Sequence, residues 1–179
     1  GTYSDITGVE RLQKYAGMFG FDSTSGIELP ESKPQISDAD AIRTAIGQGT
    51  NNFTATQLAR YVTTLANSGT CYDLSLVSEI KDIDGNVVYK NEHKVHNQLD
   101  FPTEQWNVVR QGMRQVVSVH TSSSALINQI NVAVAGKTGT AQQSDARPDH
   151  ALFVSFAPYE NPEVSVTCVI PHGYTSGNA

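Results

Sequence analysis

The sequence is poor in cysteine, in positive charge and in long apolar runs, and each shortage excludes a class of protein. Cys71 and Cys168 are the only cysteines in 179 residues. Their wide separation fits no short metal-binding motif, so two free, semi-buried thiols are expected rather than a disulfide. The net charge of −6 argues against nucleic acid as a partner. No apolar run approaches the roughly 20 residues that span a bilayer.

The composition is nevertheless that of a folded domain with a hydrophobic core. Hydrophobic residues make up 39% and charged residues 17%, a balance typical of globular proteins. Apolar residues at helical spacing predict a helix over residues 9–19. Thr54 and Gln57 form a capping box in front of a second amphipathic helix. A third helix is predicted to begin near Thr103, with Trp106 in the core.

Strands are predicted in two places. A β-hairpin is expected where residues 77–80 and 87–89 flank the turn sequence at residues 84–86. Three more strands follow one another near the C-terminus and should pair as an antiparallel sheet: residues 132–142, 150–156 and 164–170. The prediction is an α+β fold, with residues 1–130 mostly helical apart from the hairpin and residues 131–171 forming the sheet.

The sequence GKTGTAQ, at the end of the first of these three strands, combines a cation, hydroxyls and glycines. In a strand, Thr138 and Thr140 share one side and Lys137 takes the other. All three could serve one ligand if the strand is an edge, because a long lysine can reach round it. Gly136 and Gly139 have no side chains, so a ligand could lie close to the backbone. An edge N–H such as that of Thr140 could donate to a carboxylate or a developing oxyanion.

The Lys-Thr-Gly tripeptide and a pair of histidines further upstream both have simple structural interpretations. A Lys-Thr-Gly tripeptide is short, and it also occurs where an ordinary strand runs into a glycine turn with a solvated lysine. His93 and His96 have a spacing that could bind a metal ion, but nothing nearby completes a ligand set. No metal site is therefore predicted, and the tripeptide gains weight only from its context.

That context is a resemblance to a known family. GKTGTAQ resembles the third motif of the transpeptidase domain of penicillin-binding proteins, and ordered matches extend the resemblance over nearly the whole chain. The other matching segments are residues 15–21, 26–30, 46–49, 54–59, 65–69 and 150–158. Several matches in the family's order are more specific than one tripeptide. They point to the C-terminal portion of a monofunctional, class B-like domain with the penicillin-binding/β-lactamase-like fold.

The resemblance implies serine acyl transfer. A serine in a Ser-x-x-Lys motif attacks the D-Ala-D-Ala bond of a peptidoglycan stem peptide, and an amine resolves the acyl-enzyme. By the same resemblance, Lys137 supplies positive charge beside the nucleophile, and Thr138, Gly139 and Thr140 bind the terminal carboxylate of the substrate or of a β-lactam. The Thr140 N–H is also an oxyanion donor, so Lys137 and Thr140 are the expected catalytic residues. No metal or organic cofactor is implied.

The family places its Ser-x-x-Lys and Ser-x-Asn motifs before the segment where this chain begins. Ser78 and Lys81 match the first pattern, but they lie in a predicted strand, where residues three apart face opposite ways. Residues 176–178 match the second pattern, but they follow the third motif and are predicted to be a loop. We therefore expect an incomplete transpeptidase domain that forms no acyl-enzyme alone and that exposes an apolar sheet face.

Within a whole protein, the chain is expected to act on stem peptides and to bind β-lactams, together with the remaining N-terminal part and other cell-wall proteins. The family works at the extracytoplasmic face of the bacterial cell envelope, usually anchored in the cytoplasmic membrane. Two alternatives remain open. A serine β-lactamase or β-lactam sensor shares the motif and differs in deacylation. A non-catalytic binding or scaffold module is expected if the whole protein lacks the nucleophile.

Overall fold

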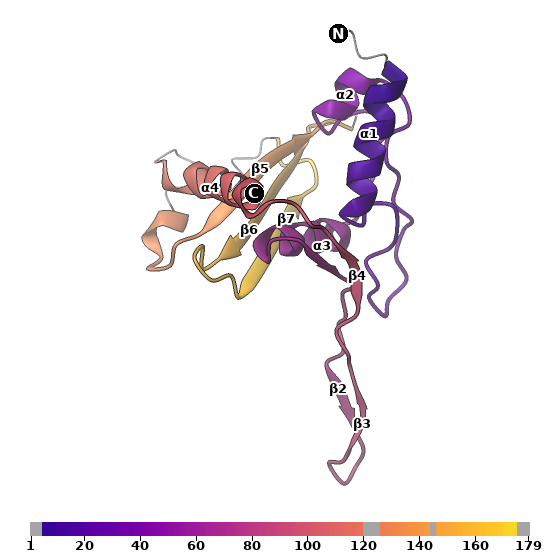
Figure 1. Cartoon of the computed structure of the whole chain (residues 1–179), viewed down its shortest axis with the longest axis vertical. Coiled ribbons are helices and arrows are strands. Elements are labelled where there is room, and N and C mark those ends of the chain that lie inside the picture. Colours follow the sequence, from indigo (N-terminus) through magenta and orange to yellow (C-terminus); the bar gives the residue numbers. More distant parts are fainter. Residues whose placement is uncertain (1–4, 120–125, 144–145, 175–179) are drawn as a thin grey trace.

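The computed structural model describes residues 5–119, 126–143 and 146–174. Helices and antiparallel strands occur side by side, as predicted for an α+β chain (Figure 1). In chain order the elements are α1 (Asp5–Met18), α2 (Ala41–Ala45), α3 (Ala55–Ala66), β1 (Thr70–Tyr72), β2 (Glu79–Lys81), β3 (Val87–Lys90), β4 (Val95–Gln98), α4 (Thr103–Ser118), a short 3-10 helix (Ile127–Gln129), β5 (Ala135–Ala141), β6 (His150–Ala157) and β7 (Val164–Ile170).

The main sheet consists of three antiparallel strands in the order β5-β6-β7, so β5 is an edge strand among the residues that the structure describes. Ala135 lies opposite Phe156 and Thr138 lies opposite Phe153. Paired residues share a face, so Phe156 and Phe153 mark the two faces of the sheet. On the Phe153 face, Val166 of β7 is 55% exposed, which matches the expectation of an exposed apolar sheet face.

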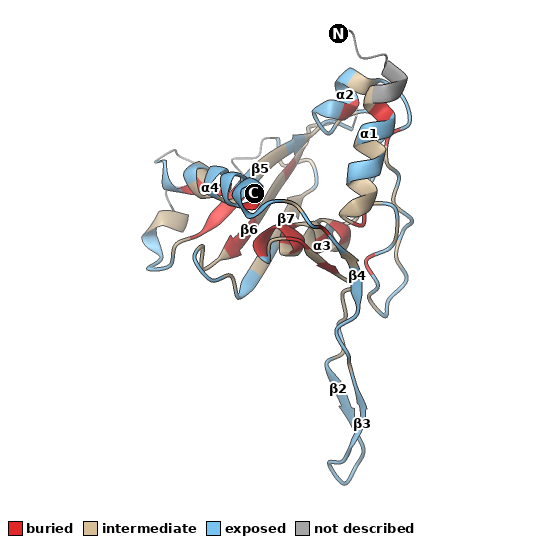
Figure 2. Cartoon of the chain, in the orientation of Figure 1, coloured by how far each residue is buried: buried red, intermediate tan, exposed pale blue. Residues whose placement is uncertain are grey.

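The hydrophobic core lies between the Phe156 face of this sheet and helices α3 and α4 (Figure 2). Its buried members are Val62, Leu65, Ala66, Cys71, Leu99, Trp106, Met113, Ala135 and Phe156. Trp106 is 5% exposed, and its ring meets Phe101 at a centroid distance of 5.5 Å. The prediction that the single tryptophan anchors the core is confirmed.

Helix α3 begins and ends as its sequence predicts. The Thr54 hydroxyl accepts from the Gln57 N–H at 3.2 Å, and the Gln57 side chain accepts from the Thr54 N–H at 2.8 Å. Gly69 follows the helix with a φ of +123°, and a Cβ there would lie 2.6 Å from the Leu99 carbonyl oxygen. Only glycine fits this close approach, so it stops the helix and admits the next segment.

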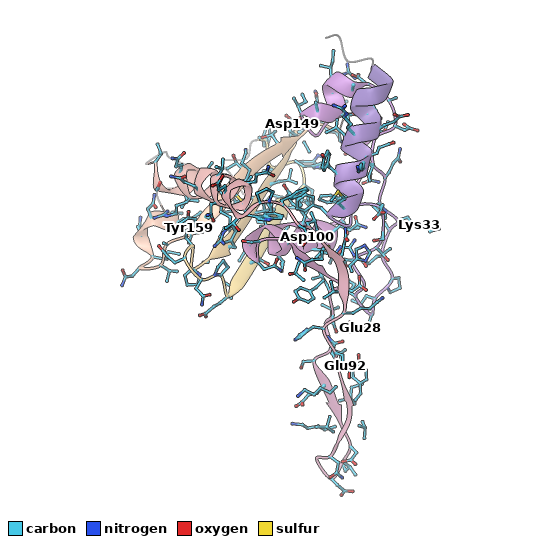
Figure 3. The ribbon with its side chains drawn as sticks, in the orientation of Figure 1. Glu28, Lys33, Glu92, Asp100, Asp149 and Tyr159 are labelled. Atoms are coloured by element: carbon cyan, nitrogen blue, oxygen red, sulfur yellow. The ribbon has the colours of Figure 1, made fainter. Side chains whose placement is uncertain are left out.

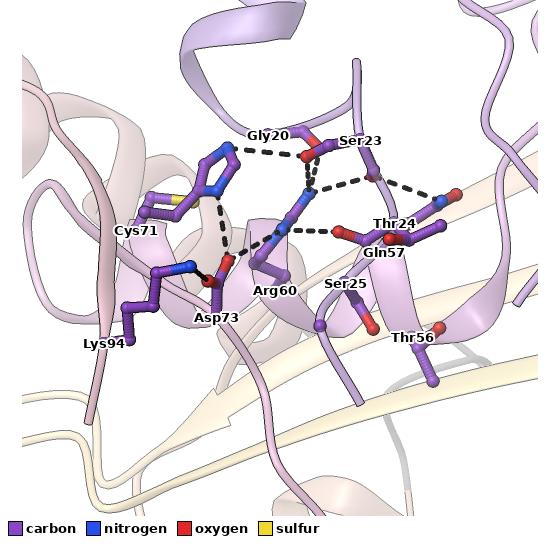
Figure 4. A network of polar contacts seen from close by, with 12 residues as sticks. Gly20, Ser23, Thr24, Ser25, Thr56, Gln57, Arg60, Cys71, Asp73 and Lys94 are labelled. Carbon is purple, nitrogen blue, oxygen red and sulfur yellow. Dashed lines mark hydrogen bonds and ion pairs between the residues drawn. The ribbon is translucent and has the colours of Figure 1, made fainter. Parts of the chain in front are cut away.

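Arg60 of α3 ties the loop after α1 to the core (Figure 4). Its side chain is 1% exposed and lies 3.6 Å from the Asp73 carboxylate. The guanidinium donates to the carbonyls of Gly20, Ser23 and Thr24. A planar group with five N–H donors can satisfy several loop carbonyls at once, which is why arginine suits this position.

Asp73 balances this buried cation together with two other groups. Lys94 approaches its carboxylate at 2.9 Å and His96 at 3.0 Å. Partial burial alone would raise the pKa of Asp73, but the hydrogen bond and charge of Lys94, with the charges of His96 and Arg60, outweigh it and lower the pKa. Asp73 therefore stays ionised at neutral pH and joins α3 to the ribbon of β1 and β4.

The predicted hairpin is formed by β2 and β3, with Ile80 opposite Tyr89. It projects away from the body, and its strands are exposed throughout (Figures 1 and 2). Glu28 lies near its base (Figure 3) and accepts from the Ser75 hydroxyl and the Leu76 N–H. These two donors lower the pKa of Glu28 to about 2.

Candidate active site

The GKTGTAQ sequence lies on β5, at the edge of the main sheet. The regular strand begins at Ala135 rather than at Val132, as the sequence had suggested. Arg114 donates to the Val134 carbonyl at 3.1 Å, and the Tyr159 N–H donates to the Ala133 carbonyl at 2.8 Å. These donors satisfy the backbone outside a regular ladder, so the strand is shorter than predicted.

Lys137 and Thr138 meet at the open edge of β5. Period-two geometry assigns Lys137 to the helix-facing side, opposite Val154, and Thr138 to the other side. The lysine nevertheless bends to the edge, where its Nζ donates to the Thr138 carbonyl at 2.7 Å. The Lys137 residue is exposed, so its ammonium group lies at the solvent boundary beside the threonine backbone.

A second side chain reaches the same edge from a distant part of the sequence. The Gln48 Nε2 donates to the Thr140 carbonyl at 3.4 Å. Thr138 and Thr140 therefore both direct their carbonyls away from β6. A strand residue points its N–H and C=O to the same side, so the Thr140 N–H also faces the open edge. Sequence reasoning did not single out Gln48, although the IGQG segment that contains it contributed to the family resemblance.

A hollow of about 650 Å³ adjoins this end of β5. Its lining residues are Ala39, Asp40, Arg43, Ile46, Gln48, Gly49, Thr50, Gln142 and Gln143. Arg43 and Asp40 form an exposed ion pair at 3.4 Å. The hollow thus brings one cation, one anion and several amides next to the strand end that follows Thr140.

The two motif glycines have different roles, and one expectation about them is wrong. A Cβ on Gly136 would lie 2.5 Å from the Phe153 ring and 3.0 Å from the Val154 carbonyl oxygen. The ring occupies the space that the sequence had suggested for a ligand, as aromatic residues do beside strand glycines. A Cβ on Gly139 would meet the Leu152 Cβ at an ordinary 3.5 Å, and the approach of a ligand to Gly139 stays a prediction.

The literal match to a nucleophile motif is not arranged as one. Ser78 precedes β2, which starts at Glu79, and Lys81 pairs with Glu79 at 2.7 Å. The predicted hairpin is confirmed, but its first strand covers Glu79–Lys81 rather than residues 77–80, so Ser78 lies just outside it. The match at residues 176–178 lies outside the described residues.

His93 and His96 contact neighbouring side chains, and the two cysteines are partly or fully buried. His96 faces Asp73, and His93 lies against the Tyr72 ring at a centroid distance of 6.4 Å. Within the described ranges, no group of three or more His, Cys, Asp or Glu side chains could hold a metal ion. Both cysteines are free, Cys71 buried and Cys168 partly buried. Burial raises the pKa of the Cys71 thiol.

No helix in the described part of the chain combines the length and apolar character needed to cross a membrane.

Comparison with known proteins identifies relatives of this chain. The chain is 31% identical to penicillin-binding protein 2B of Streptococcus pneumoniae over 96% of its own length, and 29% identical to the peptidoglycan D,D-transpeptidase MrdA of Haemophilus influenzae, also over 96%. It spans 28% and 31% of the lengths of these relatives. Both are class B penicillin-binding proteins.

Solved structures agree with the sequence relatives. Penicillin-binding protein 2B of S. pneumoniae superimposes with a TM-score of 0.79 at 28% identity, covering 92% of this chain and 29% of that one. An imipenem acyl-enzyme complex of penicillin-binding protein A of M. tuberculosis gives a TM-score of 0.80 at 25% identity, covering 93% and 38%. The family model of the penicillin-binding protein transpeptidase domain matches residues 4–179. The chain therefore belongs to the penicillin-binding protein transpeptidase family.

Proposed function

We propose that this chain is part of a peptidoglycan D,D-transpeptidase that cross-links stem peptides by serine acyl transfer. The observation that carries the proposal is the arrangement on the open edge of β5. There the Lys137 ammonium lies 2.7 Å from the Thr138 carbonyl, and Thr140 presents its backbone to the same edge. The edge thus presents a cation and strand backbone, with the Thr138 and Thr140 hydroxyls on the adjoining Phe153 face, to an extended, negatively charged peptide end.

Each motif residue has a role that its position supports. Lys137 supplies positive charge to the nucleophile and to the substrate. Thr138 and Thr140 bind the terminal carboxylate of a stem peptide or of a β-lactam, and Gly139 lets that group approach the backbone. The Thr140 N–H donates to the oxyanion of the tetrahedral intermediate. One such donor contributes about 3–4 kcal/mol of transition-state stabilisation.

The nucleophile in this proposal is a serine elsewhere in the polypeptide, in a Ser-x-x-Lys motif on a helix, where residues three apart share a face. Chain 1–179 alone therefore forms no acyl-enzyme. The whole protein acts on stem peptides at the extracytoplasmic face of the bacterial cell envelope, anchored in the cytoplasmic membrane, with other cell-wall synthesis proteins. The name of the MrdA relative and the imipenem complex of the M. tuberculosis relative support this assignment.

Labelling with a fluorescent penicillin tests the proposal. The protein expressed from its complete reading frame and chain 1–179 are treated side by side, and the labelled peptide is mapped by mass spectrometry. The proposal expects a stable label on a serine of the complete protein and none on chain 1–179. A label that is rapidly lost by hydrolysis would instead indicate a β-lactamase, and a complete protein without any label would indicate a non-catalytic module.

A further inference from the structure

Two of the carbonyls that β5 directs to its open edge, those of Thr138 and Thr140, accept a side-chain hydrogen bond. Lys137 donates to the Thr138 carbonyl from within the strand. Gln48 donates to the Thr140 carbonyl from a loop that lies 92 positions away in sequence. The second bond therefore joins two separate parts of the fold at the end of the motif.

The loop that carries Gln48 is held in one shape by its backbone. Gly47 and Gly49 flank Gln48 with φ angles of +80° and +85°, a left-handed conformation that glycine adopts without strain. The Gln48 N–H donates to the Arg43 carbonyl at 2.9 Å, and Asn51 donates to the Gln48 carbonyl at 2.9 Å. Both backbone groups of Gln48 are thus occupied, and its side chain is left to face β5.

The loop packs on a buried pair of hydroxyl side chains, Ser37 and Thr44. Ser37 is fully buried and Thr44 is 6% exposed, and the Thr44 hydroxyl donates to the Ser37 hydroxyl at 2.8 Å. A Cβ on Gly49 would lie 2.9 Å from the Ser37 Oγ, so the loop packs directly on this pair. A loop whose backbone is restrained in this way can hold the neighbouring strand β5 in a fixed position.

The strand end needs such support. Ala141 is the last residue of β5, and β6 is the one strand that pairs with Thr140 and Ala141 among the described residues. The last residues of an edge strand fray readily because half of their backbone groups have no neighbouring strand. Gln48 supplies a restraint on the opposite side, at the residue whose N–H faces the proposed oxyanion position.

We propose that Gln48 is a positioning residue for acyl transfer, holding the Thr140 backbone in the orientation in which its N–H stabilises the oxyanion. This inference rests on the proposed function. Gln48 acts through Thr140 and does not touch the reacting atoms. While Gln48 holds Thr140, the Thr140 N–H is already oriented and does not have to reorganise in the transition state. Loss of the Gln48 amide removes this pre-positioning and therefore slows the chemical step.

The test compares three variants of the protein expressed from its complete reading frame. Gln48→Met keeps the length of the side chain and removes the donor, and Gln48→Glu replaces the donor with a carboxylate that repels the carbonyl. Gln143→Glu places the same charge in the same hollow, at an exposed residue beyond the end of β5. Stopped-flow acylation by a fluorescent penicillin gives the saturating rate constant and the apparent dissociation constant separately.

The rate constant of acylation should fall about fivefold in Gln48→Met, as expected for loss of one hydrogen bond, and further in Gln48→Glu. The apparent dissociation constant and the melting temperature should stay at the wild-type values, which a purely structural role would not predict. Gln143→Glu should behave as wild type. Unchanged acylation in Gln48→Met, or a loss matched by a lower melting temperature, would overturn the inference alone. A wild-type protein that takes no label would overturn the proposed function and this inference with it.

Discussion

Substituting Gly136 by alanine should destabilise the fold far more than the same change at Gly139, although both glycines belong to one short motif. The methyl group added by Gly136→Ala would lie 2.5 Å from the far edge of the Phe153 ring and 3.0 Å from the Val154 carbonyl oxygen. The Phe153 side chain can rotate away from the methyl group. The Val154 carbonyl oxygen cannot, because it belongs to the backbone of the central strand. Relief of the second contact therefore requires β5 to move relative to β6.

The magnitude follows from these two contacts. Overpacking of a well-packed site costs about 1–3 kcal/mol, and the backbone contact places Gly136→Ala near the upper end, at about 2–3 kcal/mol. Gly139→Ala meets the Leu152 Cβ at an ordinary 3.5 Å. The Gly139→Ala variant should have a free energy of unfolding between that of the wild type and a value about 0.5–1 kcal/mol higher, because alanine restricts the unfolded chain more than glycine does.

Urea unfolding of chain 1–179, followed by the fluorescence of its single tryptophan, measures both changes, since Trp106 lies in the core beneath β5. Runs at two protein concentrations separate unfolding from self-association. In a Phe153→Leu background the cost of Gly136→Ala should fall by about half, because only the ring contact is relieved. Equal effects of Gly136→Ala and Gly139→Ala would refute the assignment of Gly136 to packing against Phe153.

Three further predictions concern charged residues. Lys137→Met should slow acylation of the complete protein by penicillin roughly 100-fold, comparable to loss of a transition-state donor, whereas Lys81→Met on the projecting hairpin should leave the rate unchanged. Arg60→Met should lower the free energy of unfolding by about 3–5 kcal/mol, because it leaves buried carbonyls and a carboxylate without their donor. The Lys94 side chain is 78% exposed, so Lys94→Met should lower the free energy of unfolding by no more than about 1 kcal/mol. The Glu28 carboxyl should titrate in an NMR experiment near pH 2 rather than 4.5. Because its pKa is lower in the folded state, its contribution to stability is complete above pH 4.5 and disappears as the pH falls toward 2. A titration near 4.5 would contradict the hydrogen bonds at the hairpin base.

The sequence predicted those parts of the fold that neighbouring residues determine. The capping box of Thr54 and Gln57, the turn between β2 and β3, and the alternation along β5 all depend on residues within a few positions. For the same reason the reach of Lys137 round an edge strand could be predicted, whereas the acceptor it finds there, the Thr138 carbonyl, could not.

Features that join distant segments could not be predicted in this way. The pairing of β1 with β4 brings together strands separated by the hairpin, and each strand is too short to show a period of its own. Arg60 has no visible partner in sequence, because the carbonyls it satisfies belong to a loop before α2. The role of Gly136 depends on the Phe153 ring of the next strand, and a glycine in the sequence does not show which distant side chain fills the space beside it.

The edge position of β5 carries both the benefit and the risk of the site. A ligand with an extended backbone can bind only to an edge whose N–H and C=O groups face outward, and such an edge also invites pairing with another strand. Lys137 places a charge on this edge, and Lys137 and Gln48 occupy two of its outward carbonyls, those of Thr138 and Thr140. A strand from another chain would have to displace both donors and bury the lysine charge. A ligand with a terminal carboxylate would instead gain from that charge, so the arrangement favours an anionic peptide end over a second strand.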